Sequence, residues 1–257
     1  MDLGLSGKVV MVAGASRGLG NAIAHTLHAE GASVSLSSSD TRAIAQAGEA
    51  LPGSLAMLCN VRDPLQIESW VAATLERFGA IDALVVNAGG PPPGSFGDFA
   101  DEDWQSAFEL TLMSAVRLVR AALPALRKSR GTVLFMTSSS VKEPIDFLLL
   151  SNVMRSGVAS LAKSLSRSLA AEGIRVNTIV PGIVETDRIK SLVVNQASAA
   201  GIDQAAQRQA MESLVPLGRF GRPEEFARVA AFLLSPAASY INGETVTVDG
   251  GTMKTLF

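Results

Sequence analysis

Short apolar runs alternate along this chain with longer segments of helical period. Seven runs rich in valine, leucine and isoleucine lie at 8–13, 33–37, 55–60, 83–87, 132–137, 175–180 and 244–248. The helical segments between the first six runs lie at 19–30, 41–51, 64–78, 102–127 and 151–172. Strands that are apolar on both sides and separated by helices are typical of a parallel sheet covered on both faces. With right-handed crossovers, the sequence predicts a doubly wound α/β fold with a seven-stranded parallel sheet flanked by helices.

The segment 187–214 interrupts this alternation between the sixth run and the next helix. Its sequence, DRIKSLVVNQASAAGIDQAAQRQAMESL, has the pattern of a helical insertion. It follows the carboxyl end of a strand, where open α/β sheets bind ligands, so we expect it to be a lid over a substrate site. The chain shows no internal repeat, low-complexity tract or linker, and we predict a single domain over 1–257.

Composition and charge exclude several classes of protein. The 22 Lys and Arg against 24 Asp and Glu give a formal net charge of −2, so we expect no nucleic-acid partner. The amino terminus does not resemble a signal peptide, and no apolar run approaches the roughly 20 residues that a bilayer requires, so we expect no membrane partner. The single cysteine, Cys59, fits a reducing, cytoplasmic location and is interpreted as a packing residue. No cluster has metal-ligand spacing, so we expect no metal.

Two of the helical segments carry polar side chains on a face that is otherwise apolar. In 102–127 this face repeats at spacings of four and three and reads Trp104, Phe108, Thr111, Ala115, Leu118 and Ala122. In 151–172 the face reads Ser151, Arg155, Val158, Ala162, Leu165 and Leu169. Side chains at such spacings share one side of a helix, so we expect both faces to point inward. Buried polar groups need partners, which makes Thr111, Ser151 and Arg155 candidate site residues.

A glycine-rich turn joins the first apolar run to the first helix. It reads Gly14-Ala15-Ser16-Arg17-Gly18-Leu19-Gly20. Glycines let the backbone turn sharply and approach a ligand, and the start of a helix offers free amides to a diphosphate. The spacing differs from the commoner dinucleotide fingerprint, and a tight strand–helix turn is the alternative interpretation. We predict a dinucleotide site whose loop residues are Gly14, Ser16, Arg17, Gly18, Leu19 and Gly20.

Over nearly its whole length the chain resembles the short-chain dehydrogenase/reductase family. Beside the glycine loop, the motifs are Asn87-Ala88-Gly89 after the fourth run, Ser138 after the fifth and Pro181-Gly182 after the sixth. The block at 219–251 is similar to the carboxyl-terminal third of β-ketoacyl-acyl-carrier-protein reductases. The resemblance implies a Rossmann-like fold and a nicotinamide cofactor. It also implies further cofactor-binding residues, namely Asn60, Val61, Asn87, Ala88, Gly89, Arg155, Pro181, Gly182, Ile183 and Thr186.

The end of the second run bears on which nicotinamide cofactor binds. Ser38 stands where an acidic residue would accept hydrogen bonds from the ribose of NAD. Ser39 lies beside it, and Arg17 and Arg42 are close in sequence. Hydroxyl and guanidinium groups suit a 2′-phosphate, so NADP(H) is favoured over NAD(H). Asp40 is the argument for NAD(H), because a small rotation would bring its carboxylate to the ribose.

The catalytic positions depart from the family pattern, which is an Asn, a Ser, a Tyr and a Lys. Ser138 matches the Ser, and the Asn position falls at Thr111. The Tyr and Lys positions, thirteen residues after Ser138 and four residues further, fall at Ser151 and Arg155. The only tyrosine, Tyr240, lies in a turn where relatives have a structural residue. The resemblance therefore implies a catalytic set of Ser138, Ser151, Arg155 and Thr111 in which the phenol is missing.

This replacement changes how a proton can reach the substrate. A tyrosine has a pKa near 10 that neighbouring cations can lower, whereas a serine alcohol is a far weaker acid. We therefore expect Ser151 to anchor a relaying water. Arg155 stays protonated and cannot relay a proton, so we expect it to hold the ribose; an ion pair with Glu143 or Asp146 is the alternative. Lys142 is another candidate proton source; the alternative is that it is a solvated loop residue without a catalytic role.

Apolar residues on two segments give an expectation about the substrate. Phe147, Leu148, Leu149 and Leu150 precede Ser151, and Ile189, Leu192, Val193 and Val194 lie on the insertion. Facing each other, they would form a pocket for a small, weakly polar carbonyl or alcohol compound; otherwise they belong to the core or to a subunit contact. The resemblance implies a homotetramer or homodimer.

We expect an NADP(H)-dependent oxidoreductase that interconverts a carbonyl and an alcohol with a non-standard proton donor. The residues leave two alternatives open. The first is an NAD(P)-binding sensor or partner-binding protein that has lost hydride transfer. The second is a dehydratase or isomerase that uses the same pocket.

Overall fold

A computed structural model describes residues 2–256 of the chain. Within this range one sheet has seven strands in the order β3-β2-β1-β4-β5-β6-β7, and all neighbours are parallel. The strands are β1 (Val9–Val12), β2 (Ser33–Ser38), β3 (Leu55–Leu58), β4 (Ala83–Val86), β5 (Thr132–Met136), β6 (Arg175–Pro181) and β7 (Thr245–Val248). Because the order runs outward from β1 in both directions, the predicted single-domain, doubly wound, Rossmann-like fold is confirmed.

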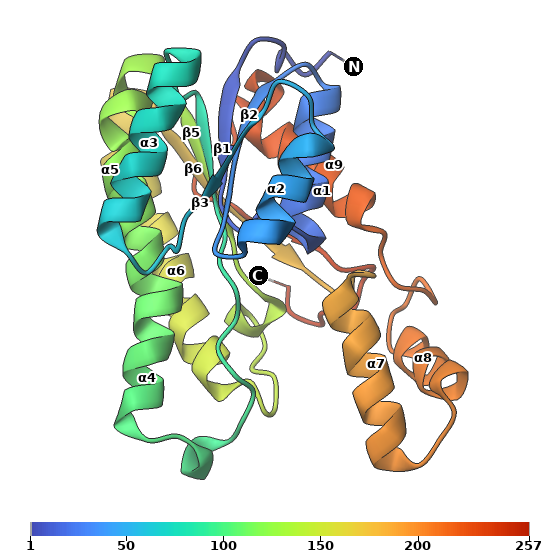
Figure 1. Ribbon diagram of the computed structural model, residues 1–257. Coiled ribbons are helices and arrows are strands. Elements are labelled where there is room, and N and C mark those ends of the chain that lie inside the picture. The colour runs from blue at the N-terminus through green and yellow to red at the C-terminus, as the bar shows by residue number, and fades with distance from the viewer. Residues whose placement is uncertain (1, 257) are drawn as a thin grey trace.

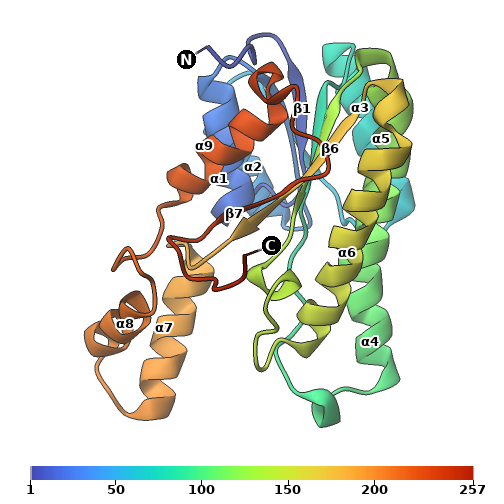
Figure 2. The same ribbon diagram turned by 180° about the vertical axis from the view of Figure 1, so that it is seen from behind.

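Helices cover both faces of this sheet. They are α1 (Gly18–Ala29), α2 (Thr41–Glu49), α3 (Pro64–Phe78), α4 (Asp101–Phe108), α5 (Ser114–Ser129), α6 (Leu149–Ser168), α7 (Asp187–Ala200), α8 (Gln204–Ser213) and α9 (Pro223–Leu234). Figures 1 and 2 show α1, α2 and α9 on one face and α3, α5 and α6 on the other. β1 contributes to both cores, because Val10 and Val12 pack with α1 and α9 while Met11 packs with α3 and α5.

The predicted helix over 102–127 is divided by a π-helical turn, η2 (Glu109–Met113), between α4 and α5. Thr111 lies in this turn and is buried, so its predicted inward orientation is confirmed. Trp104 and Phe108, before the turn, are only half-buried and pack against Leu150 of α6 in a separate small cluster. π-Helical turns occur frequently at functional sites, and this one lies beside the start of α6.

The inward face of α6 agrees with the sequence pattern. Ser151, Val158 and Ala162 are buried on it, and Leu169, which follows the helix, is buried as well. The helix begins two residues before Ser151, at Leu149, so both Ser151 and Arg155 lie in its first turns. Neither α6 nor any other helix within residues 2–256 is long and apolar enough to cross a membrane.

The segment 187–214 forms a pair of helices, α7 and α8, as its pattern predicted. Val193 of α7 and Met211 of α8 are buried with Phe220 in a small core of their own. Figures 1 and 2 show this pair projecting past the carboxyl ends of the strands, with α4 and the start of α6 projecting on the opposite side. The carboxyl-terminal segment lies between the two projections, at the sheet edge where open α/β sheets bind ligands.

Candidate active site

The loop between β1 and α1 leaves no room for side chains at two of its glycines. A Cβ atom on Gly14 would lie 2.7 Å from Nδ2 of Asn87, and one on Gly20 would collide with the carbonyl oxygen of Gly14. Gly14 and Gly18 also have φ angles of +60° and +61°, which favour glycine. Nδ2 of Asn87 donates to the carbonyl oxygens of Ala13 and Gly14 at 3.1 and 3.2 Å. The end of β4 therefore holds the glycine loop in place.

The first turn of α1 offers its backbone amides outward. The N-cap residue Arg17 makes no side-chain hydrogen bond to that turn. Free amides at the start of a helix bind phosphate groups, because the helix dipole also favours a negative charge there. Together with the close approach that the glycines allow, these residues fit the diphosphate of a dinucleotide.

Hydroxyls and one ion pair lie at the end of β2. The Ser16 hydroxyl donates to Oγ of Ser38 at 2.9 Å, and the Asp40 amide donates to the same oxygen at 3.2 Å. The Asp40 carboxylate caps α2 by accepting a backbone amide at 3.0 Å, and it lies 3.6 Å from the Arg17 guanidinium. Asp40 is therefore held by its own helix and by Arg17. The exposed neighbours are Ser39 and Arg42.

The other residues predicted to contact the cofactor follow the carboxyl ends of β3, β4 and β6. They are Asn60, Val61, Asn87, Ala88, Gly89, Pro181, Gly182, Ile183 and Thr186. Parallel strands end at one edge of a sheet, so these residues lie along the same edge as the glycine loop. A Cβ atom on Gly182 would lie 2.5 Å from Cα of Asp249, which shows how closely the segments after β6 and β7 approach each other.

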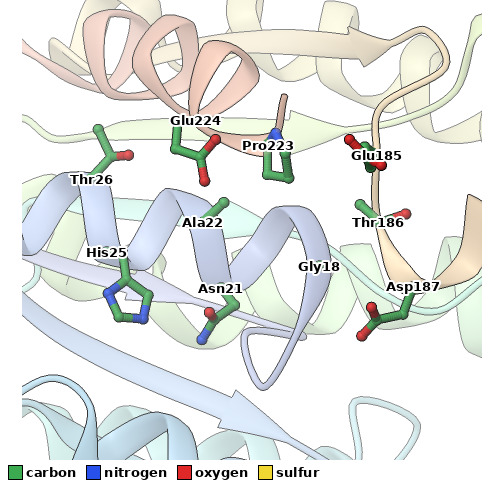
Figure 3. Close-up of a pocket in the computed structure, with 10 residues that line it drawn as sticks. All are labelled: Gly18, Asn21, Ala22, His25, Thr26, Glu185, Thr186, Asp187, Pro223 and Glu224. Atoms are coloured by element: carbon green, nitrogen blue, oxygen red, sulfur yellow. The ribbon is translucent and has the colours of Figure 1, made fainter. Parts of the chain in front are cut away.

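A cavity of about 260 Å³ lies between α1, the segment after β6 and the start of α9. Figure 3 shows Thr186 and Pro223 across from the first turns of α1, where Gly18 and Ala22 lie. Two of the lining residues, Gly18 and Thr186, are predicted cofactor contacts. The predicted catalytic residues do not line this cavity, so it lies apart from them.

Ser138 begins the short turn η3 (Ser139–Val141) directly after β5. Its Oγ accepts the Ser140 amide at 3.2 Å, which leaves its own hydrogen free for another acceptor. Within residues 2–256, the buried hydroxyls of Thr137 and Ser140 at this turn and of Thr111 in η2 have no hydrogen-bond partner. α6, which carries the buried Ser151, packs against both η2 and η3. Since buried hydroxyls normally have a partner, this group is suited to hold ordered water.

Arg155 lies with its guanidinium deep among protein atoms. Its Nη1 donates to the carbonyl oxygens of Met136 and Thr137 at 3.3 and 3.4 Å, which places it at the end of β5. Burial, reinforced by the Arg188 guanidinium, lowers the pKa of Arg155 to about 10. It therefore remains a cation at neutral pH. Among residues 2–256 it forms no ion pair with Glu143 or Asp146, so that alternative is wrong.

Arg188, which the sequence patterns did not single out, also reaches this region. A Cβ atom placed on Gly90 would lie 3.0 Å from its Nη1 and 3.4 Å from its Nη2. The side chain therefore extends from the first turn of α7 to the segment after β4, past the end of β5. One clue in the sequence is that Arg188 lies two residues after the predicted cofactor contact Thr186, but spacing does not reveal where a long exposed side chain points.

The loop over 138–147 is tied to two other segments. The carbonyl oxygen of Phe147 accepts the Gly94 amide at 2.6 Å, and Phe147 itself has a φ angle of +64°, which is unusual for a bulky residue. Oε1 of Glu143 accepts the Lys254 amide at 2.9 Å, so the carboxyl-terminal segment contacts this loop. These contacts join the loop after Ser138 to the segment after β4 and to the carboxyl-terminal segment.

The apolar residues predicted to line a substrate pocket have different environments. Leu150 and Val193 are buried in two separate small clusters, so for them the core alternative is correct. Phe147 and Leu192 are 71% and 39% exposed and remain available to a ligand or to another subunit. The full set therefore does not form one pocket wall.

Cys59 and Tyr240 are not placed for a catalytic role. Cys59 is buried, and burial, with a smaller effect of Asp63, raises its pKa to about 11, so it is a thiol and not a nucleophile at neutral pH. Tyr240 is fully exposed, so it is not a buried phenol that could replace the missing catalytic tyrosine. No group of three or more His, Cys, Asp or Glu side chains within residues 2–256 could hold a metal ion.

Comparison with known families identifies this arrangement. A family model described as enoyl-(acyl carrier protein) reductase matches residues 14–253. The chain belongs to the short-chain dehydrogenase/reductase family. This short-chain dehydrogenase/reductase is 37% identical over 254 residues to the 3-oxoacyl-[acyl-carrier-protein] reductase of Vibrio cholerae, covering 97% of this chain and 98% of that relative. It is therefore an oxidoreductase enzyme.

Two solved structures of short-chain dehydrogenase/reductases are similar over nearly their whole length. L-Sorbose reductase from Gluconobacter frateurii, complexed with NADPH and L-sorbose, has a TM-score of 0.94 and 32% identity, covering 100% of both chains. A short chain oxidoreductase from Pseudomonas aeruginosa PAO1, described as containing an atypical catalytic center, has a TM-score of 0.90 and 31% identity, covering 98% of this chain and 99% of that chain.

Proposed function

We propose that this enzyme is an NADP(H)-dependent oxidoreductase that interconverts a carbonyl and an alcohol by a proton route without a phenol. The observation that carries the proposal is a complete dinucleotide loop at the same sheet edge as Ser151 and Arg155, which by the family resemblance stand where Tyr and Lys are expected. The sorbose reductase solved with NADPH supports the choice of cofactor. The Pseudomonas oxidoreductase, described as containing an atypical catalytic center, supports the proposal that a member of this family can have different residues at its catalytic positions.

The cofactor end of the site is assigned to the first half of the chain. The glycine loop and the amides that begin α1 bind the diphosphate. Ser38 and Arg17 bind the 2′-phosphate, with Ser39 and Arg42 beside them, because Asp40 is already engaged as a helix cap. Bound NADPH supplies a hydride to the carbonyl carbon, and a proton from water completes the alcohol.

The substrate end is assigned to Ser138 and Arg155. The free hydrogen of the Ser138 hydroxyl donates to the carbonyl oxygen. The Arg155 cation, fixed by the carbonyls at the end of β5, stabilises the negative charge that develops on that oxygen and holds the ribose beside it. Both residues are rigidly placed, which favours catalysis by preorganised charges.

The proton reaches the oxygen through a water held by hydroxyls. Thr111 and Ser140 each bury a hydroxyl that has no partner among the described residues 2–256, on elements that pack against the helix of Ser151. A water needs two to four polar partners to be held in such a place. Ser151 is its anchor, and Lys142, on the same loop as Ser138, is the source from which the proton is replaced.

Three further features belong to this proposal. The α7–α8 pair closes over the substrate, which is a small and largely apolar carbonyl or alcohol compound that contacts Phe147 and Leu192. The chain assembles as a dimer or tetramer through α5 and α6, whose Val153 is 48% exposed. The enzyme works in the cytoplasm, in keeping with its single buried thiol.

One alternative is favoured by a specific observation, the absence of a phenol at Ser151. A protein that binds NADP(H) as a sensor and has lost hydride transfer needs the same glycine loop. Titrating the purified protein with NADPH and then adding a broad carbonyl panel separates the two functions. We expect binding followed by NADPH oxidation above background with at least one compound. Tight binding without oxidation across the panel would favour the sensor.

A further inference from the structure

Two guanidinium groups converge at the carboxyl edge of the sheet. Arg155 is fixed by the carbonyl oxygens that precede Ser138, and Arg188 reaches across from α7 to Gly90. Arg155 comes from α6 and contacts the end of β5, whereas the exposed Arg188 comes from α7, which follows β6, and reaches the segment after β4. The two cations are close enough that Arg188 disfavours the charge on Arg155.

Several acidic side chains of the surrounding segments are engaged elsewhere, and Asp146 is exposed and pairs with neither arginine. Glu185 accepts from Arg208 at 2.6 Å, and Asp187 lies 3.7 Å from Lys190. Glu143 accepts the Lys254 amide, and Asp249 accepts backbone amides of its own turn. Within residues 2–256, neither Arg155 nor Arg188 belongs to an ion pair. A pair of cations without a counterion in the protein is suited to receive an anion.

The position of the pair separates it from the cofactor's diphosphate. The diphosphate has its own donors, the amides at the start of α1, beside β1. β4 lies between β1 and β5, and Arg155 is bound to the end of β5, one residue before Ser138. An anion held by Arg155 and Arg188 would therefore lie next to the hydroxyl that we assign to the substrate's carbonyl oxygen.

The geometry points to an Arg155–Arg188 site for a carboxylate of the substrate, which makes the substrate an oxo acid or the corresponding hydroxy acid. Guanidinium groups match carboxylates because they donate two parallel hydrogen bonds. The substrate would then have an aliphatic part that contacts Phe147 and Leu192 and one negatively charged end that binds the two arginines. This inference rests on the proposed function, because it names the substrate class of that site.

Equilibrium binding tests the site without requiring turnover. With NADP⁺ present, calorimetry measures the affinity of short straight-chain oxo acids and of their uncharged methyl esters. Wild-type protein should bind the acids more tightly, and Arg188→Met should weaken acid binding by about tenfold or more, as expected for a lost charge-assisted bond, while leaving the esters unchanged. Arg228→Met, which removes an exposed arginine on α9, is the matched control and should leave both unchanged.

The affinity for NADPH, measured with the same variants, shows whether Arg188 binds a carboxylate of the substrate or the diphosphate of the cofactor. In Arg188→Met it should change by less than about twofold, because only a substrate contact is lost. A large loss of NADPH affinity with unchanged acid binding would overturn the inference and assign Arg188 to the cofactor's diphosphate. Equal binding of acids and esters by wild-type protein would also overturn it. Arginine-dependent acid binding in a protein that oxidises no NADPH would support the site and refute the proposed function.

Discussion

Ser38 is the residue at which we expect the choice between NADPH and NADH to be made. Its Oγ accepts from Ser16 and from the Asp40 amide, and a carboxylate at this position would oppose the 2′-phosphate that we propose Ser38 binds. Like charges brought together in a binding site cost several kcal/mol. We expect Ser38→Asp to lower the ratio of kcat/KM for NADPH over NADH by about tenfold or more. Steady-state kinetics with both cofactors measures this ratio, and an unchanged ratio would place the selectivity elsewhere.

Ser151 is the residue that we expect to carry the relay water. Ser151→Ala removes the anchor, so kcat should fall by about tenfold to a hundredfold, within the usual range for a lost acid–base contribution. Affinity for NADPH should stay the same, and Ser151→Thr, which keeps a hydroxyl, should recover part of kcat. Single-turnover kinetics separates this effect from product release. Full activity in Ser151→Ala would mean that the proton takes another path.

Single residues were predictable from the sequence where a motif or a helical spacing fixes their place. Thr111 and Ser151 are buried and Arg155 is half-buried, because spacings of three and four put each on the inward face of its helical segment. Arg188 was not predictable, because its importance depends on a long side chain that reaches Gly90 from another element. The engagement of Asp40 as a helix cap likewise required the backbone of α2 to be known.

β2 and α3 are joined by a buried hydrogen-bond network. The Trp70 indole donates to Oγ of Ser35 at 2.8 Å, and the Ser35 and Thr74 hydroxyls are 2.7 Å apart. Ser35→Ala would leave the buried indole N–H without an acceptor, at a cost of about 1–3 kcal/mol in the free energy of unfolding. Urea denaturation measures this loss. Ser164→Ala, at an exposed position of α6, is the control, and an equal effect of both changes would contradict the expectation.

The start of α9 should make stability depend on pH. Glu225 pairs with Arg219 at 2.8 Å and accepts the Arg222 amide at 2.8 Å. The hydrogen bonds from Arg219, and then from the Arg222 backbone, lower the pKa of Glu225 from 4.5 to about 2. A carboxyl whose pKa is depressed by folding stabilises the fold above its ordinary pKa and loses this contribution as the pH falls towards the depressed value.

Glu225→Gln should therefore lower the Tm at neutral pH, because the amide keeps the shape but not the charge. The difference from wild type should shrink as the pH falls from 4.5 to about 2, where the native carboxyl also becomes neutral. Thermal unfolding followed by circular dichroism across this range measures the difference. A difference that is the same at every pH would assign the effect to packing instead of charge.

Helices with a clear apolar periodicity were predicted well from the sequence. Breaks within a helix, such as a π-helical turn, were not. The pattern over 102–127 gave the correct inward face, yet it could not show the π-helical turn at Glu109–Met113. The turn itself packs against α6, where Gly157 lets Leu112 approach, because a Cβ on Gly157 would lie 3.0 Å from Cδ2 of Leu112. Packing between distant segments decides such details.

On the scale of the whole molecule, the sheet order and the place of the site follow from the alternation of strands and helices. The parallel sheet forces the strand ends, and therefore Asn87, Ser138 and Gly182, to one edge. The return of the carboxyl-terminal segment to Glu143 could not be read from the sequence, because a single backbone hydrogen bond leaves no pattern. The contact between this loop and the carboxyl-terminal segment is thus a property of the tertiary structure.

The central claim is that this molecule transfers a hydride although it lacks a phenol at the expected position. NADPH that carries deuterium at the transferred position tests it most directly, when wild-type protein and Ser138→Ala are incubated with oxo acids and uncharged carbonyl compounds. The account predicts that deuterium enters the alcohol formed by the wild type, in step with NADPH oxidation, and that Ser138→Ala binds NADPH but transfers far less. Tight NADPH binding by the wild type with no deuterium in any product would contradict it.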